Sequence, residues 1–245
     1  MSAAATLATA RRVLAQLRRD PRTVALLIGA PLLIVTLLRY VLDGAPETFR
    51  RVGGPMLGLF PFILMFVVTS ITMLRERTSG TLERLMAMPI AKLDLLTGYG
   101  IAFALVAIAQ AVALSAVGLG LLDVTVRGDT WLVVVLAVGN AVLGMSLGLF
   151  VSAFATSEFQ AVQFMPVLVF PQMLLCGLFV PRDDMAPVLR GAGDALPLTY
   201  AFDALQRVSA GTHLGGRFAV DAAVIVGGTA VLLALGAGTL GRRTP

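Results

Sequence analysis

The stretch MLRERTSGTLERLMAMPIAKLDLL, residues Met73–Leu96, carries seven charged side chains in 24 residues. The 19 residues Met56–Leu74 and the 26 residues Thr97–Leu122, on either side of this charge, contain none. A run of about 20 apolar residues is long enough for a helix to cross the hydrocarbon core of a bilayer. The sequence therefore predicts a short charged loop between two membrane-spanning helices.

The rest of the chain has the same character. Its 245 residues are 58% hydrophobic and 13% charged, with a mean hydropathy of +0.90, whereas soluble proteins are roughly 25% charged. We expect a single all-α, polytopic membrane domain over residues 1–245, because a helix satisfies its own backbone hydrogen bonds in lipid. Six spans are predicted: Thr23–Leu42, Met56–Leu74, Thr97–Leu122, Thr130–Ala155, Phe159–Pro181 and Phe218–Gly241.

Residues 1–22 are predicted to form an amphipathic helix on the membrane surface. At 100° per residue, Leu7, Val13 and Leu17 share one face, and the arginines fall on the other face. Asp20-Pro21 ends this helix. A frayed basic terminus is the alternative.

The distribution of basic residues predicts the orientation. If the N-terminus is cytoplasmic, 11 of the 19 basic residues lie on the cytoplasmic side, which agrees with the positive-inside rule. An even number of spans then places both termini, and the charged loop, in the cytoplasm. The long outer loop, residues 182–217, has apolar residues spaced for two short helices that dip into the outer leaflet; an ordinary extracellular loop is equally compatible with the pattern.

The charged loop itself has a helical pattern. Ser79-Gly80-Thr81 is a natural helix entry, and Glu83 falls in the first turn, where the helix dipole favours an acid. Leu82 and Leu85 share a face, and Pro89 ends the helix. Such a helix either docks into a groove of a soluble partner or rests on the lipid headgroups.

The segment RERTSGTLERLMAMPIAKLDLLTGYG resembles the coupling segment of ABC-2 type permeases, the membrane subunits of ATP-driven exporters. The matching residues are Glu76, Gly80, Thr81, Leu82, Glu83, Leu85 and Pro89. In the outer loop, Pro197, Tyr200 and Asp203-Ala204-Leu205 also match the pattern of that family. Within that family, the chain resembles the drug-resistance exporters of the daunorubicin type.

This resemblance implies that residues 75–95 couple the spans to a separate nucleotide-binding ATPase. The chain is then a transport subunit and not an enzyme: its one lysine, Lys92, lies between Ala91 and Leu93 and cannot form a Walker A motif. ATP and Mg are expected on the partner, and no cofactor or metal in this chain. A second permease half, identical or a sister chain, is implied, in a bacterial inner membrane. No nucleic-acid partner is expected, since the arginines are spread among short loops.

In related permeases the second and fifth spans line the pathway, and the outer loop closes it. The implied lining residues are Phe60, Phe66, Gln163, Phe164 and Gln172. The implied outer-gate residues are Pro197 and Tyr200. Phenylalanine is the only aromatic residue at mid-membrane, which favours a lipophilic or amphipathic cargo such as a drug, an antibiotic or a lipid. A polysaccharide or glycolipid exporter is the alternative within the family.

Particular residues bear on other functions. The segment GMSLG, Gly144–Gly148, fits a serine-hydrolase pattern and suggests an intramembrane protease with His213, but a packing pair of glycines is favoured. Arg39 and Asp221 lie near span ends, where they are expected to reach the interface. The lack of other charges inside spans disfavours an ATP-independent transporter or channel. Gln110 and Asn140 are expected to form hydrogen bonds between helices.

Overall fold

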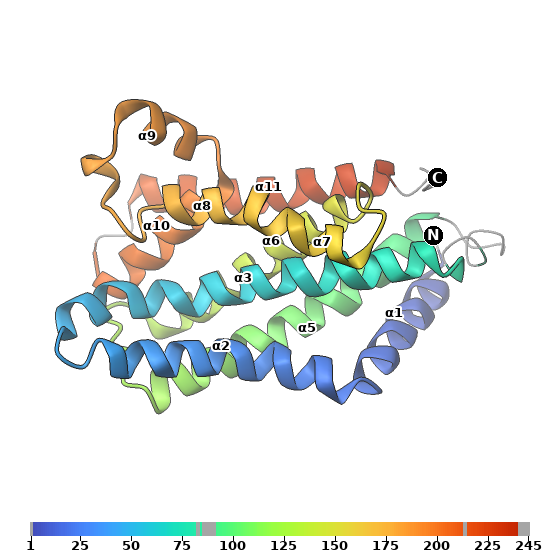
Figure 1. Ribbon diagram of the computed structural model, residues 1–245, viewed down its shortest axis with the longest axis horizontal. Coiled ribbons are helices and arrows are strands. Elements are labelled where there is room, and N and C mark those ends of the chain that lie inside the picture. The colour runs from blue at the N-terminus through green and yellow to red at the C-terminus, as the bar shows by residue number, and fades with distance from the viewer. Residues whose placement is uncertain (1, 82–83, 85–91, 213–214, 240–245) are drawn as a thin grey trace.

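The computed structural model describes residues 2–81, 84, 92–212 and 215–239, and these form helices and turns without a β-strand. The helices are α1 (Ala3–Arg18), α2 (Pro21–Val41), α3 (Pro46–Thr78), α5 (Lys92–Gly120), α6 (Thr130–Val151), α7 (Glu158–Phe164), the π-helical turn η1 (Met165–Val169), α8 (Phe170–Leu175), the 3-10 turn η2 (Arg182–Asp184), α9 (Pro187–Asp194), α10 (Pro197–Ala210) and α11 (Gly216–Thr239). The long helices run side by side along the long axis of the molecule (Figure 1). Helix α1 and the end of α11 lie at one end, and α9 lies at the other (Figure 1).

Five of these helices are long and apolar enough to cross a membrane. They are Pro21–Val41, Pro46–Thr78, Thr97–Gly120, Thr130–Val151 and Gly216–Thr239. This confirms the all-helical polytopic fold. The prediction of a single helical span at Phe159–Pro181 is wrong in detail. The helical run there extends only from Glu158 to Leu175, and a π-helical turn interrupts the α-helix in its middle.

Two prolines account for this change of winding. Pro166 and Pro171 have no backbone N–H, so neither can donate the usual hydrogen bond to the carbonyl four residues earlier. Between them the chain widens into η1, and the Phe170 N–H donates to the Met165 carbonyl, five residues back. The fifth apolar segment is therefore three short helical pieces, α7, η1 and α8.

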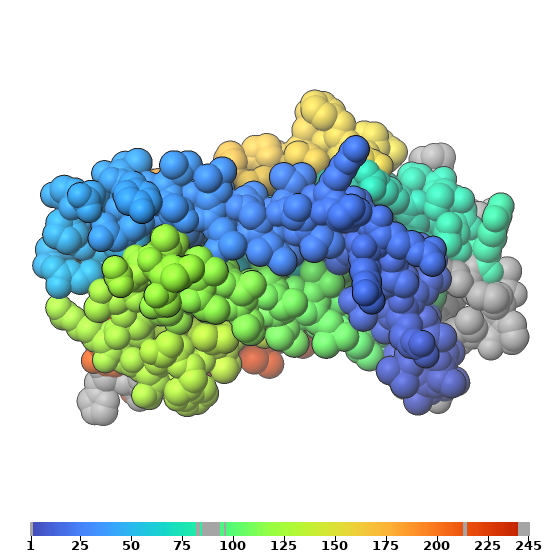
Figure 2. Space-filling view, turned by 90° about the horizontal axis from the view of Figure 1, so that it is seen from below, coloured from blue at the N-terminus to red at the C-terminus, as the bar shows by residue number. Residues whose placement is uncertain are grey.

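Helix α1 turns sharply into α2 at Asp20. The Asp20 carboxylate accepts hydrogen bonds from the Thr23 N–H (3.1 Å) and the Thr23 hydroxyl (2.6 Å), and Pro21 occupies the first turn of α2. Helix α1 consequently lies across the end of α5 instead of along it (Figures 1 and 2). The amphipathic N-terminal helix predicted from the sequence is confirmed, and its buried residues include Ala10 and Val13.

The central packing contact joins α3 and α6. A methyl group added at Gly144 would overlap the carbonyl oxygen of Phe62, and one at Gly148 would crowd the carbonyl of Phe66. Gly144 and Gly148 thus let the two backbones touch, which confirms the small-residue packing pair. Ser146 lies in the same helix and donates to the Val142 carbonyl at 2.8 Å, so GMSLG is not a strand-to-helix nucleophile elbow; His213 lies outside the described residues.

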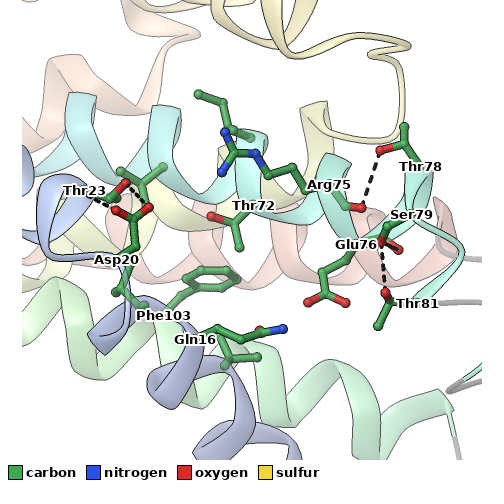
Figure 3. A pocket seen from close by; sticks show the side chains of 14 residues that line it. Gln16, Asp20, Thr23, Thr72, Arg75, Glu76, Thr78, Ser79, Thr81 and Phe103 are labelled. Carbon is green, nitrogen blue, oxygen red and sulfur yellow. Dashed lines mark hydrogen bonds between the residues drawn. The ribbon is translucent and has the colours of Figure 1, made fainter.

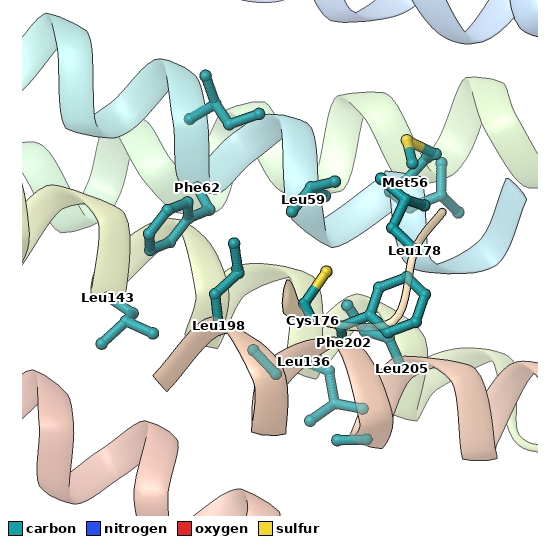
Figure 4. Packing of buried hydrophobic residues seen from close by; sticks show 14 of the residues in the cluster. Met56, Leu59, Phe62, Leu136, Leu143, Cys176, Leu178, Leu198, Phe202 and Leu205 are labelled. Atoms are coloured by element: carbon teal, nitrogen blue, oxygen red, sulfur yellow. The ribbon is translucent and has the colours of Figure 1, made fainter. Parts of the chain in front are cut away.

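The apolar core fills the space between α3, α6 and α10 (Figure 4). Helices α9 and α10 are the two short helices predicted between residues 182 and 217. The apolar face of α10 is buried against α3 and α6 instead of lying on the surface. Its buried apolar side chains are Leu198, Phe202, Leu205 and Val208.

Candidate functional site

The charged stretch joins the end of α3 to the start of α5, at the end of the molecule where α1 also lies. Of the predicted coupling residues, Leu82, Glu83, Leu85 and Pro89 lie outside the described residues. Gly80 and Thr81 follow the end of α3, and Gly80 has φ +68, a backbone conformation that favours glycine. The Gly80 carbonyl accepts the Arg84 N–H at 3.1 Å, which is the backbone bond of a helical turn.

Glu76 points into the protein. Its side chain is 7% exposed, and its Oε2 atom lies 3.3 Å from Nη2 of Arg12 on α1. The same Arg12 guanidinium donates to the Tyr99 hydroxyl on α5 and lies over the Tyr99 ring. A buried acid needs such a partner because an unpaired charge in an apolar interior is costly. The Glu76–Arg12 pair therefore joins three helices, α1, α3 and α5, near the start of the charged stretch.

Helix α1 has a second attachment at the start of α5. The Ser2 N–H donates to Asp94 Oδ2 at 2.9 Å, and the hydroxyls of Thr6 and Thr97 lie 3.4 Å apart. These bonds place Glu76 and Asp94, near the two ends of the charged stretch, against the same helix α1. The roles of Arg12, Tyr99 and Asp94 could not be predicted from the sequence, since contacts between residues 64 to 92 positions apart leave no local pattern.

The two arginines beside Glu76 tie α3 to other helices. Arg75 donates two hydrogen bonds to the Glu158 carboxylate at the start of α7, at 2.6 and 2.9 Å. These bonds lower the pKa of Glu158 below its usual range. Arg77 is buried and donates from Nη1 to the Thr239 carbonyl near the end of α11, at 3.3 Å. The last turn of α3 is thus bonded to α1, α7 and α11.

A cavity of about 630 Å³ opens beside this cluster (Figure 3). Helix α1 and the first turn of α2 form one wall, α3 forms the other, and Phe103 of α5 forms the floor. Its polar lining residues are Gln16, Asp20, Thr23, Thr72, Arg75, Glu76, Thr78, Ser79 and Thr81. Its apolar lining residues are Val13, Leu17, Val68, Ile71 and Phe103.

The predicted pathway residues do not come together at this cavity, and none of them lines it. Phe66 is fully buried between α3 and α6, whereas Phe60 and Phe164 are partly buried. Gln163 is exposed, and Gln172 is buried and donates to the Leu168 carbonyl at 2.9 Å. Their role as a lining stays a prediction.

The predicted gate residues lie at the start of α10. Pro197 occupies its first turn, and the Tyr200 hydroxyl donates to the Asp194 carbonyl of α9 at 2.8 Å. Tyr200 therefore holds the two short helices together. A gating role for both residues stays a prediction.

A charged cluster that the sequence did not predict joins α10 to α11. Asp203 lies 3.1 Å from Arg207 and 3.7 Å from Arg217, and Asp221 lies 3.7 Å from Arg207 and 3.9 Å from Arg217. The expectation that Asp221 reaches the interface is wrong: its side chain is fully buried, because α10 covers it. The only local signal for this cluster was the spacing of four residues between Asp203 and Arg207 and between Arg217 and Asp221.

Gln110, Asn140 and Arg39 are three further polar residues of the predicted spans. Gln110 donates to the Leu27 carbonyl of α2 at 2.9 Å, which confirms a hydrogen bond between helices. Asn140 is buried, and its amide has no hydrogen-bond partner in the described part of the chain, so the same expectation is wrong there. Arg39 bonds to Asp43 at 3.1 Å near the end of α2.

These features define a class: a polytopic helical membrane protein with an amphipathic N-terminal helix, a charged connection anchored beneath the bundle, and a short helix buried before the last span. Residues 4–208 match the family of ABC-2 type transporters, and the chain belongs to that family. The chain is similar to ABC transporter G family member 20 of Dictyostelium discoideum and to the probable multidrug ABC transporter permease YbhR of Escherichia coli strain K12, at 26% identity over 153 residues in each case. These matches cover 62% of this chain, 21% of the Dictyostelium protein and 42% of YbhR.

Proposed function

We propose that this chain is the membrane-spanning permease subunit of an ATP-driven exporter. The observation that carries the proposal is the anchoring of the charged stretch near both of its ends: Glu76 and Asp94 are both bonded to α1. A loop that only connects two spans needs no such support. A segment that transmits force from another protein needs rigid ends, since a compliant end would absorb the displacement.

The partner is proposed to be a separate nucleotide-binding ATPase that carries ATP and Mg. The segment between α3 and α5 would dock into a cleft of that ATPase. The last turn of α3 is bonded to α1, α7 and α11, so a displacement at the segment would reach several helices at once. A second permease half, identical or a sister chain, would complete the pathway.

The cargo is proposed to be lipophilic or amphipathic, such as a drug, an antibiotic or a lipid, moved outward across a bacterial inner membrane. Both termini would be cytoplasmic. This orientation would place the exposed arginines of α1 and its C-terminal end, Arg11, Arg18 and Arg19, against the anionic inner leaflet. The name of the similar YbhR protein, a probable multidrug permease, agrees with this class of cargo.

Purification in mild detergent with its native partners tests the proposal. Mass spectrometry is expected to find an ATPase with a Walker A motif, and cargo movement in vesicles is expected to require ATP. Movement of cargo by the purified chain alone, without ATP, would identify an ATP-independent transporter or channel and would reject the proposal.

A further inference from the structure

The cavity between α1 and α3 has the size and lining of a ligand site. Its volume of about 630 Å³ lies within the range of small-molecule pockets, roughly 300–1,000 Å³. Apolar side chains such as Leu17, Ile71 and Phe103 form one part of the lining, and polar groups form the other. The cavity lies beside the membrane-surface helix α1, where an amphiphile in the adjacent leaflet would present its headgroup.

The charges around the cavity favour a cation. Asp20 and Glu76 reach the space between α1 and α3 from two sides, and Arg75 also lines it (Figure 3). Arg75 is already neutralised by two hydrogen bonds to Glu158, and Glu76 by Arg12. Asp20 is the carboxylate that no arginine neutralises directly, since its bonds come from Thr23.

Asp20 also keeps its charge. The hydrogen bond from the Thr23 hydroxyl, together with that from the Thr23 N–H, lowers the pKa of Asp20 below its usual range. The same bonds fix the carboxylate at the start of α2, at the rim of the cavity. An ionised acid held in place beside an apolar floor is suited to an ammonium group attached to an apolar body.

We propose that this cavity binds the ammonium group of an amphiphile, with Asp20 as its principal counter-charge and Phe103 and Leu17 against its apolar part. The inference rests on the proposed permease function, to which it adds a substrate class: cationic amphiphiles taken from the leaflet beside α1. The ammonium of an ethanolamine phospholipid has the same chemistry and is the other source of such a group.

Binding to the full-length chain in phosphatidylcholine nanodiscs tests the site. The probe is radiolabelled decylamine, compared with decanol, and binding to protein-free nanodiscs is subtracted. Decylamine is expected to bind more tightly than decanol. Equal binding of the two probes would overturn the proposal, because the carboxylates would then contribute nothing.

Variants locate the site. Asp20→Asn keeps a residue that caps helices well but removes the charge, so decylamine affinity is expected to fall about fivefold, as for a partly exposed ion pair, with decanol binding unchanged. Asp43→Asn makes the same change at the other end of α2 and is expected to have no effect. Thr72→Trp is expected to fill the cavity and weaken both probes. Unchanged decylamine binding to Asp20→Asn would place the amine elsewhere and overturn the proposal.

A second set of nanodiscs identifies the source of the ammonium. Displacement of decylamine by phosphatidylethanolamine, but not by phosphatidylcholine, would assign the site to that lipid headgroup. Retention of decylamine would assign the site to a free cationic amphiphile. None of these measurements needs ATP or a partner, so a chain that binds the amine but does not export would reject the proposed function and leave the site intact.

Discussion

Nη2 of Arg12, on the surface helix α1, lies 3.3 Å from Oε2 of Glu76, in the last turn of α3. The same guanidinium donates to Tyr99 on α5. One side chain therefore holds together the three helices that surround the start of the charged segment. The amphipathic N-terminal helix is consequently a structural part of the bundle.

Removal of this arginine is expected to destabilise the protein. Breaking a buried ion pair from one side costs about 3–5 kcal/mol, but the Arg12 side chain is 29% exposed, so we expect Arg12→Ala to cost about 1–3 kcal/mol. Thermal unfolding in detergent measures this. Arg11→Ala, which removes an exposed neighbour on the same helix, is the matched control. An equal melting temperature for the two variants would show that the Arg12–Glu76 contact does not hold α1 in place.

The close packing of α3 against α6 predicts different effects of alanine at two glycines of α6. A methyl group at Gly144 would overlap the Phe62 carbonyl, whereas one at Gly139 would meet Ile225 at an ordinary 3.6 Å. Gly144→Ala is expected to destabilise the fold by about 1–3 kcal/mol, as overpacking does, and Gly139→Ala is expected to be neutral or slightly stabilising. Fluorescence-detected size-exclusion chromatography after a heating series compares them. The account of this interface fails if both variants survive heating equally.

The acid–arginine cluster between α10 and α11 predicts that Asp221 holds α10 in place. Asp221→Asn leaves Asp203 as the one acid of the cluster beside Arg207 and Arg217. Because these two arginine side chains are 32% and 52% exposed, we expect the free energy of unfolding to fall by only about 1–3 kcal/mol. Faster proteolysis of the 182–217 segment is expected to accompany it. Asp183→Asn, at a side chain that is 98% exposed, is the control. Identical proteolysis of the two variants would mean that the buried acid does not fix α10.

The proposed orientation is tested by cysteine labelling in intact cells. Thr125→Cys, between α5 and α6, and Val188→Cys, in α9, place probes at exposed positions, and Ser79→Cys places one at the exposed end of α3. Helix α9 lies at the end of the molecule opposite α1 (Figure 1). A membrane-impermeant maleimide is expected to label the first two and to spare Ser79→Cys. Native Cys176 is 1% exposed and should stay unlabelled. Labelling of Ser79→Cys from outside would reverse the orientation and remove the coupling role of the segment.

Features set by local composition could be predicted from the sequence. The apolar runs indicated five of the spans, and the arc of leucines and arginines indicated α1. The break at Asp20-Pro21 was also predicted, because a capping acid before proline is a local signal. Pro166 and Pro171 can be read from the sequence, but the π-helical turn with which they interrupt the fifth apolar segment could not be predicted from it.

Features set by tertiary contacts could not be predicted. The burial of Asp221 depends on α10 folding back into the bundle, and the pairing of Arg12 with Glu76 depends on α1 crossing α5. Asn140 shows the opposite error: a polar residue in a span was expected to find a partner, yet its amide has none in the described part of the chain. Each case was decided by neighbours distant in the sequence.

The most direct test of the central claim is co-purification of the ATPase with Glu83→Lys and Leu85→Ala. We propose that Glu83 meets a polar or cationic group of the ATPase and that Leu85 fills its cleft. Loss of one partner of a desolvated charge contact costs about 2–5 kcal/mol, and truncation of a buried leucine costs about 2–5 kcal/mol, so either change is expected to weaken the complex tenfold or more. Both variants are expected to insert normally, to lose the ATPase on purification and to stop exporting. Variants that retain the ATPase as tightly as the parent and export normally would show that the charged segment is only a connecting loop, and would contradict the account.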